Sequence, residues 1–205
     1  MPMKLPSVQE CYGLFQQYHV PRSIFEHCQQ VSDLSVSIAK KLQGKKIIVD
    51  MELVQIGALL HDWMKAVTFD KLEACERFNY TPAIEEIKAW KQLKQMFPDK
   101  HETEVAHELL KDTYPELAQF LLQEGSLYEN ASVQSWEEKI VHYADWRILG
   151  TKVIPLQQRL EDFSQRYKNK LSKDFKKWER MKHTIQQIEQ EICKTLQVNP
   201  EQLGF

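Results

Sequence analysis

The chain has 205 residues, of which 42% are hydrophobic, 27% charged and 10% aromatic. This composition is typical of a soluble globular protein, and a chain of this length can bury a sizeable core without disulfide staples. With 27 basic and 29 acidic side chains, the formal net charge of −2 gives no general attraction to nucleic acid or anionic lipid.

The cysteines and the first residues indicate the compartment. Cys11, Cys28, Cys75 and Cys193 form no CxxC pair, and the opening sequence MPMKLPSVQE lacks the apolar stretch of a signal peptide. No apolar run approaches the roughly 18 residues that a membrane span needs. We therefore expect a cytoplasmic protein without a transmembrane segment.

Glycine content and hydrophobic periodicity predict an all-α fold. There are 6 glycines in 205 residues, less than half the usual share of roughly 7%, so tight turns and hairpins should be few. No repeat or Gly/Ser linker divides the chain, and we expect a single domain over residues 1–205. Apolar residues at helical spacing predict helices over 24–42, 50–61, 83–96, 100–112, 115–124 and 135–150, followed by two long helices between 155 and 197 with a break near 169–172.

Three residues give local detail to the first two of these helices. Pro21 fits the first turn of the helix over 24–42, and Asp50 is suited to cap the start of the next one. Gly57, inside the second helix, is small enough to allow close packing against another helix.

Metal-binding residue types occur on the apolar faces of three predicted helices. His27 lies between Ile24 and Val31 on such a face, His61 continues the face of the second helix, and Asp145 follows Val141 by four residues. An ionised carboxylate among apolar side chains needs a cation or several donors. A divalent ion held by His27, His61, Asp62 and Asp145 would meet this need, and two imidazoles with two carboxylates suit Mn, Fe, Ni, Co or Mg.

Each of these residues also has a structural interpretation. A single histidine such as His27 on an apolar face is commonly a hydrogen-bonded core residue. Asp145 has Arg147 and Lys139 nearby in sequence as alternative partners. It is the combination of the four residues that favours a metal site.

The order H…HD…D, formed by His27, His61-Asp62 and Asp145, resembles the HD-domain superfamily of metal-dependent phosphohydrolases. Four segments carry the resemblance: VPRSIFEHCQQVSDLSVSIAKKL, LVQIGALLHDWMKA, HETEVAHELL and EEKIVHYADWRILGTKVIPLQQRLEDFSQRY. It covers roughly residues 20–170 and leaves about 171–205 as a C-terminal helical extension. The resemblance implies an HD-domain-like helical bundle with the metal at its centre, and hydrolysis of a nucleotide or another small phosphate ester by a metal-activated water.

The resemblance also implies roles for individual residues. Asp62 would bind the metal and orient the water, and Lys65, in the position of the HDxxK lysine, would offset charge on the substrate phosphate. His101 stands at the first histidine position of relatives with two metals and would otherwise contact the phosphate or carry a proton. At the second such position this chain has Glu124, and glutamate can also bind a divalent ion. The number of ions per chain, one or two, therefore stays open.

Other polar and aromatic side chains have two interpretations each. Arg22 and Arg147 flank the ligand helices and suit phosphate recognition, but also structural ion pairs. Lys65 also fits a surface lysine and Glu124 a solvated helix end. His142 would support the site or be merely packed, whereas His19, His107 and His183 are expected at the surface. Tryptophans that would stack a base or fill the core are Trp63, Trp90 and Trp146.

Three rival functions remain open. A catalytically silent HD fold would act as a regulatory or interaction module through the charged C-terminal helices. A di-metal oxygenase would need a complete second metal site, which Glu124 argues against. A nuclease-like role would rely on the locally basic residues 168–182, although the net charge argues against nucleic acid. The expected partner is a small phosphate compound such as a nucleotide and not a membrane, with a homodimer left open.

Overall fold

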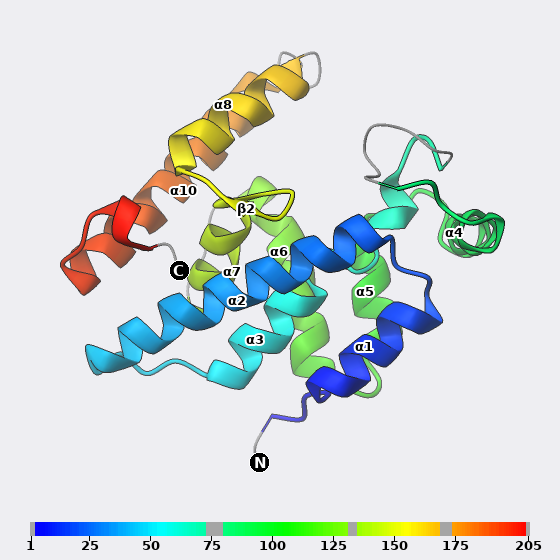
Figure 1. Cartoon of the computed structure of the whole chain (residues 1–205), viewed down its shortest axis with the longest axis horizontal. Coiled ribbons are helices and arrows are strands. Elements are labelled where there is room, and N and C mark those ends of the chain that lie inside the picture. Colours follow the sequence, from blue (N-terminus) through cyan, green and yellow to red (C-terminus); the bar gives the residue numbers. More distant parts are fainter. Residues whose placement is uncertain (1–2, 73–79, 131–134, 169–173, 204–205) are drawn as a thin grey trace. The chain divides into compact units, whose positions relative to one another are not determined.

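The computed structural model describes residues 3–72, 80–130, 135–168 and 174–203, apart from the side chains of 124–130. Within these ranges the fold is all-α, as predicted, with one two-stranded antiparallel hairpin. No described helix combines the length and the apolar character needed to cross a membrane. The elements in chain order (Figure 1) are α1 (Val8–Gln17), α2 (Arg22–Gly44), α3 (Met51–Leu60), the 3-10 helix η1 (Lys65–Thr68), α4 (Ile84–Met96), α5 (Glu102–Leu110), α6 (Pro115–Asn130), α7 (Trp136–Asp145), β1 (Ile148–Leu149), β2 (Lys152–Val153), α8 (Leu156–Arg166), α10 (Phe175–Leu196) and the 3-10 helix η2 (Pro200–Leu203).

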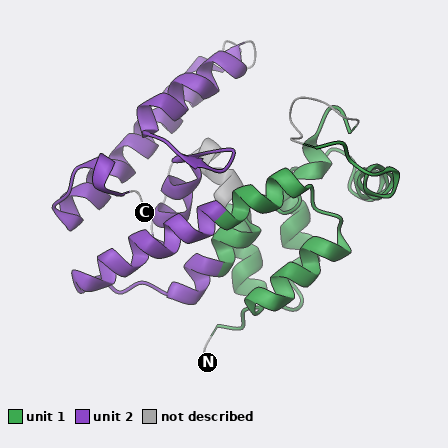
Figure 2. Cartoon of the chain, in the orientation of Figure 1, with its two compact units in different colours: residues 1–29, 56–125 green, residues 30–55, 126–205 purple. Residues whose placement is uncertain are grey.

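The chain forms two compact units, coloured separately in Figure 2. Unit 1 comprises Met1–Gln29 and Ile56–Gly125, and unit 2 comprises Gln30–Gln55 and Ser126–Phe205. The division therefore falls within α2, α3 and α6. The single HD-type domain expected from the sequence stays a prediction.

Two predictions about α3 are confirmed. The Asp50 Oδ1 atom accepts hydrogen bonds from the backbone N–H groups of Glu52 (3.1 Å) and Leu53 (3.0 Å), so Asp50 caps the helix. A Cβ added to Gly57 would lie 2.4 Å from Cε1 of Phe120 on α6. Close approach of the Phe120 ring within unit 1 therefore depends on the absence of a side chain at residue 57.

Several boundaries differ from the sequence prediction. The prediction places no helix before residue 21, yet Ser7 and Glu10 form a capping box that begins α1. Pro21 precedes the first helical residue of α2, and its carbonyl accepts the N–H groups of Ile24 and Phe25. α5 begins at Glu102 and not at residue 100, and α6 continues to Asn130 instead of ending at 124.

The predicted helix over 135–150 is wrong beyond residue 145. α7 ends at Asp145, and the chain turns into the β1–β2 hairpin, in which Ile148 pairs with Val153. Gly150, at the turn, has φ +63°, a left-handed conformation that glycine adopts at little cost. The helical spacing of the apolar residues therefore continues past the point where the backbone leaves the helix.

The core of unit 1 includes a cluster of Ala66, Phe69 and Trp90. The Trp90 indole Nε1–H donates to the carbonyl of His19 at 2.6 Å. Trp63 is also buried and meets the Tyr18 ring edge-on, with 5.1 Å between ring centroids. Trp63 and Trp90 are therefore core residues, the structural alternative named above. Partly buried side chains packed against the cluster are Ile24, Leu72, Tyr80 and Ile87.

In unit 2, α7 packs against α10. The Trp146 ring lies against Phe163 and Trp178, at centroid distances of 5.1 and 6.4 Å, so Trp146 is also part of a core. The helices α8 and α10 confirm the prediction of helical structure on both sides of a break. The predicted break near 169–172 lies outside the described residues.

The described cysteines form no disulfide. Cys11, Cys28 and Cys193 carry free thiols, and Cys75 lies outside the described residues. Burial raises the pKa of the Cys11 thiol to about 12 and also raises that of Cys193.

Candidate metal centre

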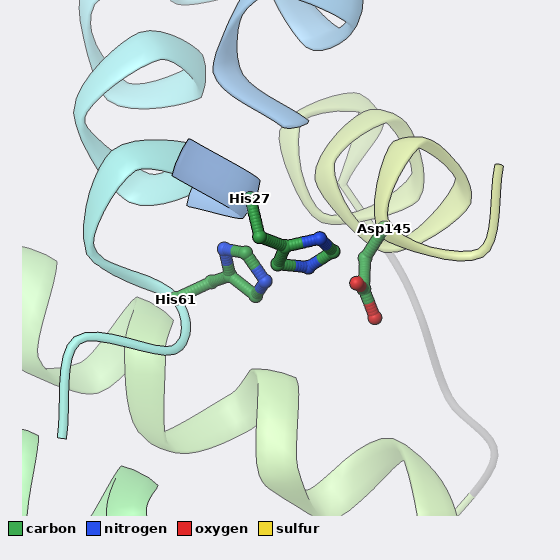
Figure 3. A group of neighbouring side chains, drawn as sticks. All are labelled: His27, His61 and Asp145. Atoms are coloured by element: carbon green, nitrogen blue, oxygen red, sulfur yellow. The ribbon is translucent and has the colours of Figure 1, made fainter. Parts of the chain in front are cut away.

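Three of the four predicted metal ligands come together. His27, His61 and Asp145 each offer one ligand atom, and these atoms all lie within 4.8 Å of one another. Figure 3 shows the three side chains converging, His27 from α2, His61 from the turn after α3, and Asp145 from the end of α7. Residues separated by more than 100 positions in the sequence thus supply a donor set of two imidazoles and a carboxylate.

The His61 ring is held in one orientation by the backbone of its own turn. Its Nδ1 lies 2.7 Å from the carbonyl oxygen of Ala58. Because a carbonyl oxygen can only accept, the proton is on Nδ1, and Nε2 of the neutral ring carries the lone pair that a metal needs. The residue is only 7% exposed, and its ring centroid is 5.4 Å from that of His27. Such a fixed, buried imidazole is typical of a metal ligand.

Asp62, the fourth predicted ligand, lies beside this group. Its Oδ2 atom is 3.9 Å from Nε2 of His61, and its Oδ1 atom accepts a hydrogen bond from the Lys65 ammonium at 3.1 Å. The two carboxylate oxygens therefore face two different partners. A metal-binding role for Asp62 stays a prediction.

Lys65 connects Asp62 to a residue that the sequence analysis missed. Its Nζ atom also donates to Oε1 of Glu102 at 2.6 Å, and the Glu102 side chain is only 5% exposed. The other carboxylate oxygen of Glu102, Oε2, lies 3.3 Å from Nε2 of His101. A glutamate in the first turn of a helix is ordinary, because it complements the helix dipole, so the sequence carried no signal for this contact.

His101 is the N-cap residue of α5. Its Nδ1 atom accepts the backbone N–H of Thr103 at 3.4 Å, which leaves Nε2 to carry the proton of the neutral ring. The side chain is 48% exposed. The imidazole is therefore accessible from solvent while its cap contact fixes its orientation.

Arg22 lies at the exposed start of α2, five residues before His27. Its guanidinium Nε donates to Glu26 at 2.7 Å, and its backbone N–H donates to the Tyr80 hydroxyl at 3.2 Å. Burial raises the pKa of Tyr80 to about 12, so this hydroxyl stays protonated at neutral pH. The structure thus places Arg22 at the beginning of the helix that carries His27.

Arg147 occupies a different environment, inside unit 2. The residue is 4% exposed; its Nε donates to the Ile154 carbonyl at 2.6 Å, and Nη1 donates to the Pro200 carbonyl at 3.2 Å and to the Tyr143 hydroxyl. Arg147 is thus held by neutral groups inside unit 2, and the contacts are hydrogen bonds instead of the ion pair named as its alternative. Lys139, the other residue considered as a partner of Asp145, forms an ion pair with Glu191 at 2.8 Å.

The other histidines named in the sequence analysis differ in exposure. His142 is buried at 3% exposure. His19 and His183 are exposed, as expected, whereas His107 is half-buried. The side chain of Glu124, considered for a second metal, lies outside the described residues.

Comparison with known proteins identifies the family. The model of the HD domain family matches residues 24–148, a span that contains His27, His61, Asp62 and Asp145. The chain belongs to the HD domain family. HD domains bind divalent metals and are usually metal-dependent hydrolases, although some are inactive.

A protein of Methanocaldococcus jannaschii, described as uncharacterized, is 26% identical over 144 residues, which cover 70% of this chain and 77% of that protein. No solved structure matches the chain.

Proposed function

We propose that this HD-domain protein is a metal-dependent phosphohydrolase that acts on a nucleotide or another small phosphate ester. The observation that carries the proposal is the convergence of His27, His61 and Asp145, whose ligand atoms lie within 4.8 Å of one another. Family membership supports the reaction class, because HD domains are usually hydrolases.

The donor set fits a divalent ion. The Ala58 carbonyl fixes the His61 tautomer so that Nε2 offers a lone pair, which is the outer-sphere support usual for metal-binding histidines. Two imidazoles with one carboxylate, and Asp62 as a fourth ligand, would hold Mn, Fe, Ni, Co or Mg. When bound, such an ion supplies a Lewis acid for a phosphoryl oxygen and lowers the pKa of a coordinated water.

The residues of the chain would contribute binding and proton transfer. Asp62 would accept a hydrogen bond from the attacking water and fix its direction. The Lys65 ammonium, next to Asp62, would offset the negative charge that develops on the transferred phosphoryl group. His101 would act as the general acid in its doubly protonated form, giving one proton to the leaving oxygen and returning to the neutral ring.

Arg22 completes the proposed site as a phosphate-binding residue at the exposed start of α2. A guanidinium binds phosphate through paired hydrogen bonds, and its contact with Glu26 orients the side chain. We include neither Arg147, which is buried among unit 2 groups, nor a second ion at His101 and Glu124 in this proposal.

Metal analysis combined with a phosphatase assay tests the proposal. The wild type, Asp145→Asn and His61→Ala would be purified without chelator and analysed for bound elements, with His183→Ala, a change of an exposed histidine on α10, as the matched control. We expect about one ion per chain in the wild type and the control, and loss of the ion in both ligand variants. Hydrolysis of an aryl phosphate, a bis-aryl phosphate and a nucleotide panel should follow the metal content.

The outcomes separate the rival functions. A metal that binds without any hydrolysis would favour the regulatory module and contradict the proposal. No bound ion, even after addition of Mn, Ni, Co or Mg, would contradict the metal site itself. Circular dichroism of each variant checks that it remains helical, and Asp145→Asn is nearly isosteric, so its result does not depend on tolerance of a cavity.

A further inference from the structure

Glu102 links the three residues predicted to be catalytic. Its Oε1 atom accepts a hydrogen bond from Lys65, which also donates to Asp62, and its Oε2 atom lies 3.3 Å from Nε2 of His101. Lys65 and Glu102 are 37 residues apart in sequence. This tertiary contact therefore joins the start of η1 to the start of α5, within unit 1.

Burial makes the contact between Lys65 and Glu102 a strong constraint. The Glu102 side chain is 5% exposed, and a carboxylate removed from water in this way needs a cation or several donors close by. The Lys65 ammonium, at 2.6 Å, satisfies that need. Removal of one partner from such a pair leaves an uncompensated buried charge, which is why these pairs hold their geometry.

The lysine side chain by itself does not define a position. It has four rotatable bonds, and its contact with Asp62 is a local one between residues three positions apart, of a kind that contributes little at a protein surface. With 35% of the Lys65 side chain exposed, the ammonium can reach solvent. A second, buried carboxylate on another helix restricts the ammonium to a place between Asp62 and Glu102.

We propose that Glu102 is a positioning residue that holds the Lys65 ammonium beside Asp62. Its importance for catalysis rests on the proposed phosphohydrolase function, whereas the positioning itself does not. The Lys65 ammonium pairs with Glu102 as well as with Asp62. An ammonium paired with Asp62 alone would compete with a metal ion for the Asp62 carboxylate.

Lysine acylation measured by mass spectrometry tests the positioning directly. The variants are Glu102→Gln, which fills the same space and keeps an oxygen that accepts from Lys65, and Glu102→Ala, which removes the contact. The matched control is Glu108→Ala on the same helix, because Glu108 pairs with Lys100 and both side chains are more than a third exposed. No metal or substrate is needed.

We expect Lys65 to react slowly in the wild type, several-fold faster in Glu102→Ala, and at an intermediate rate in Glu102→Gln. Glu108→Ala should raise the reactivity of Lys100 and leave that of Lys65 unchanged. An unchanged reactivity of Lys65 in Glu102→Ala would overturn the inference. If Glu102→Ala proves unfolded by circular dichroism, the comparison of Glu102→Gln with the wild type decides in the same way.

Kinetics then relate the positioning to the reaction. In a wild type that hydrolyses phosphate esters, Glu102→Ala should lower kcat/KM by about 10–100-fold, the range usual for residues that support a metal site. Glu102→Gln should recover part of the loss. Activity equal to that of the wild type in Glu102→Ala would contradict a role in catalysis. A wild type without hydrolysis would refute the proposed function, and the acylation result would still decide on the positioning.

Discussion

Lys65 in unit 1 and Arg147 in unit 2 make an instructive comparison. The sequence analysis considered both cations for phosphate binding, Lys65 because it stands in the position of the HDxxK lysine and Arg147 because it flanks a predicted ligand helix. In the structure Lys65 is 35% exposed and lies between two carboxylates, whereas Arg147 is 4% exposed and donates to two carbonyls and a tyrosine hydroxyl. Two cations with the same expected role thus belong to a candidate site in one unit and to the packing of the chain in the other.

The environment of each cation decides the difference. The partners of Lys65 are the carboxylates of Asp62 and Glu102, and both residues have proposed roles in the reaction. The partners of Arg147 are neutral and tie the end of α7 to Ile154 and to Pro200 near the C-terminus. Burial raises the pKa of Tyr143, the third partner, far above its usual range, so its hydroxyl stays protonated in this network.

The largest expected effect is on activity, in Lys65→Met. Loss of the ammonium removes a charge that opposes the charge developing on phosphate, and such losses cost about 10²–10³-fold in rate. We expect kcat/KM to fall by this factor while the metal content is unchanged. Activity assays and elemental analysis at a temperature where the variant is folded check this result. A Lys65→Met variant as active as the wild type would contradict a role of Lys65 in the reaction, and Lys65 would then not differ from Arg147 in function.

The next effect is on stability, in Arg147→Met. The change leaves the carbonyls of Ile154 and Pro200 and the hydroxyl of Tyr143 without their donor, so the free energy of unfolding should drop by about 2–4 kcal/mol. Arg147→Lys should recover only part of the lost stability, because an ammonium lacks the planar set of N–H donors that a guanidinium provides. Urea unfolding measures the change, and kcat/KM of the folded fraction should remain close to that of the wild type. A loss of activity without a loss of stability would place Arg147 in the site after all.

A smaller effect concerns helix packing in unit 1. Gly57→Ala would bring a methyl group within 2.4 Å of the Phe120 ring, and such overpacking typically costs about 1–3 kcal/mol. Gly13→Ala in α1 is the matched control, since nothing lies within 4 Å of its added Cβ. Thermal unfolding of both variants checks the prediction, and equal stability of the two would show that Phe120 can move at no cost.

The smallest effect compares one thiol from each unit. Cys11 in unit 1 is fully buried, with a pKa of about 12, whereas Cys193 in unit 2 is half-buried with a more modestly raised pKa. We expect Cys193 to react faster with a thiol reagent in the native protein. Equal rates, or a faster Cys11, would contradict the difference in burial.

The raised pKa of Cys11 makes the stability of the fold depend on pH. Between about pH 9 and 12 the unfolded chain loses the Cys11 proton and the folded protein keeps it, so the free energy of unfolding falls as pH rises. Below pH 9 the contribution of the thiol is fully present. Cys11→Ala should therefore show a shallower loss of stability over this window, as measured by urea unfolding.

The sequence predicted much of the fold because helix-forming information is local. The apolar periodicity indicated most of the helices, and Asp50 and Gly57 have the roles expected of a cap and a close helix contact. The helix α1 was missed although its capping box is visible as Ser7-x-x-Glu10. The stretch after Asp145 was assigned to a helix, because periodicity does not show where Gly150 lets the chain turn.

The sequence by itself determined the ligand types and their places on or next to apolar helix faces, which was enough to indicate His27, His61, Asp62 and Asp145 as a group. A polar residue on an apolar face is a local signal, and a metal site needs several of them. Only the tertiary structure decided which charges meet. It brought Glu102 to Lys65 across 37 residues and directed Arg147 to backbone carbonyls. Long-range pairing of charges depends on which surfaces the fold buries, and no spacing along the chain encodes that.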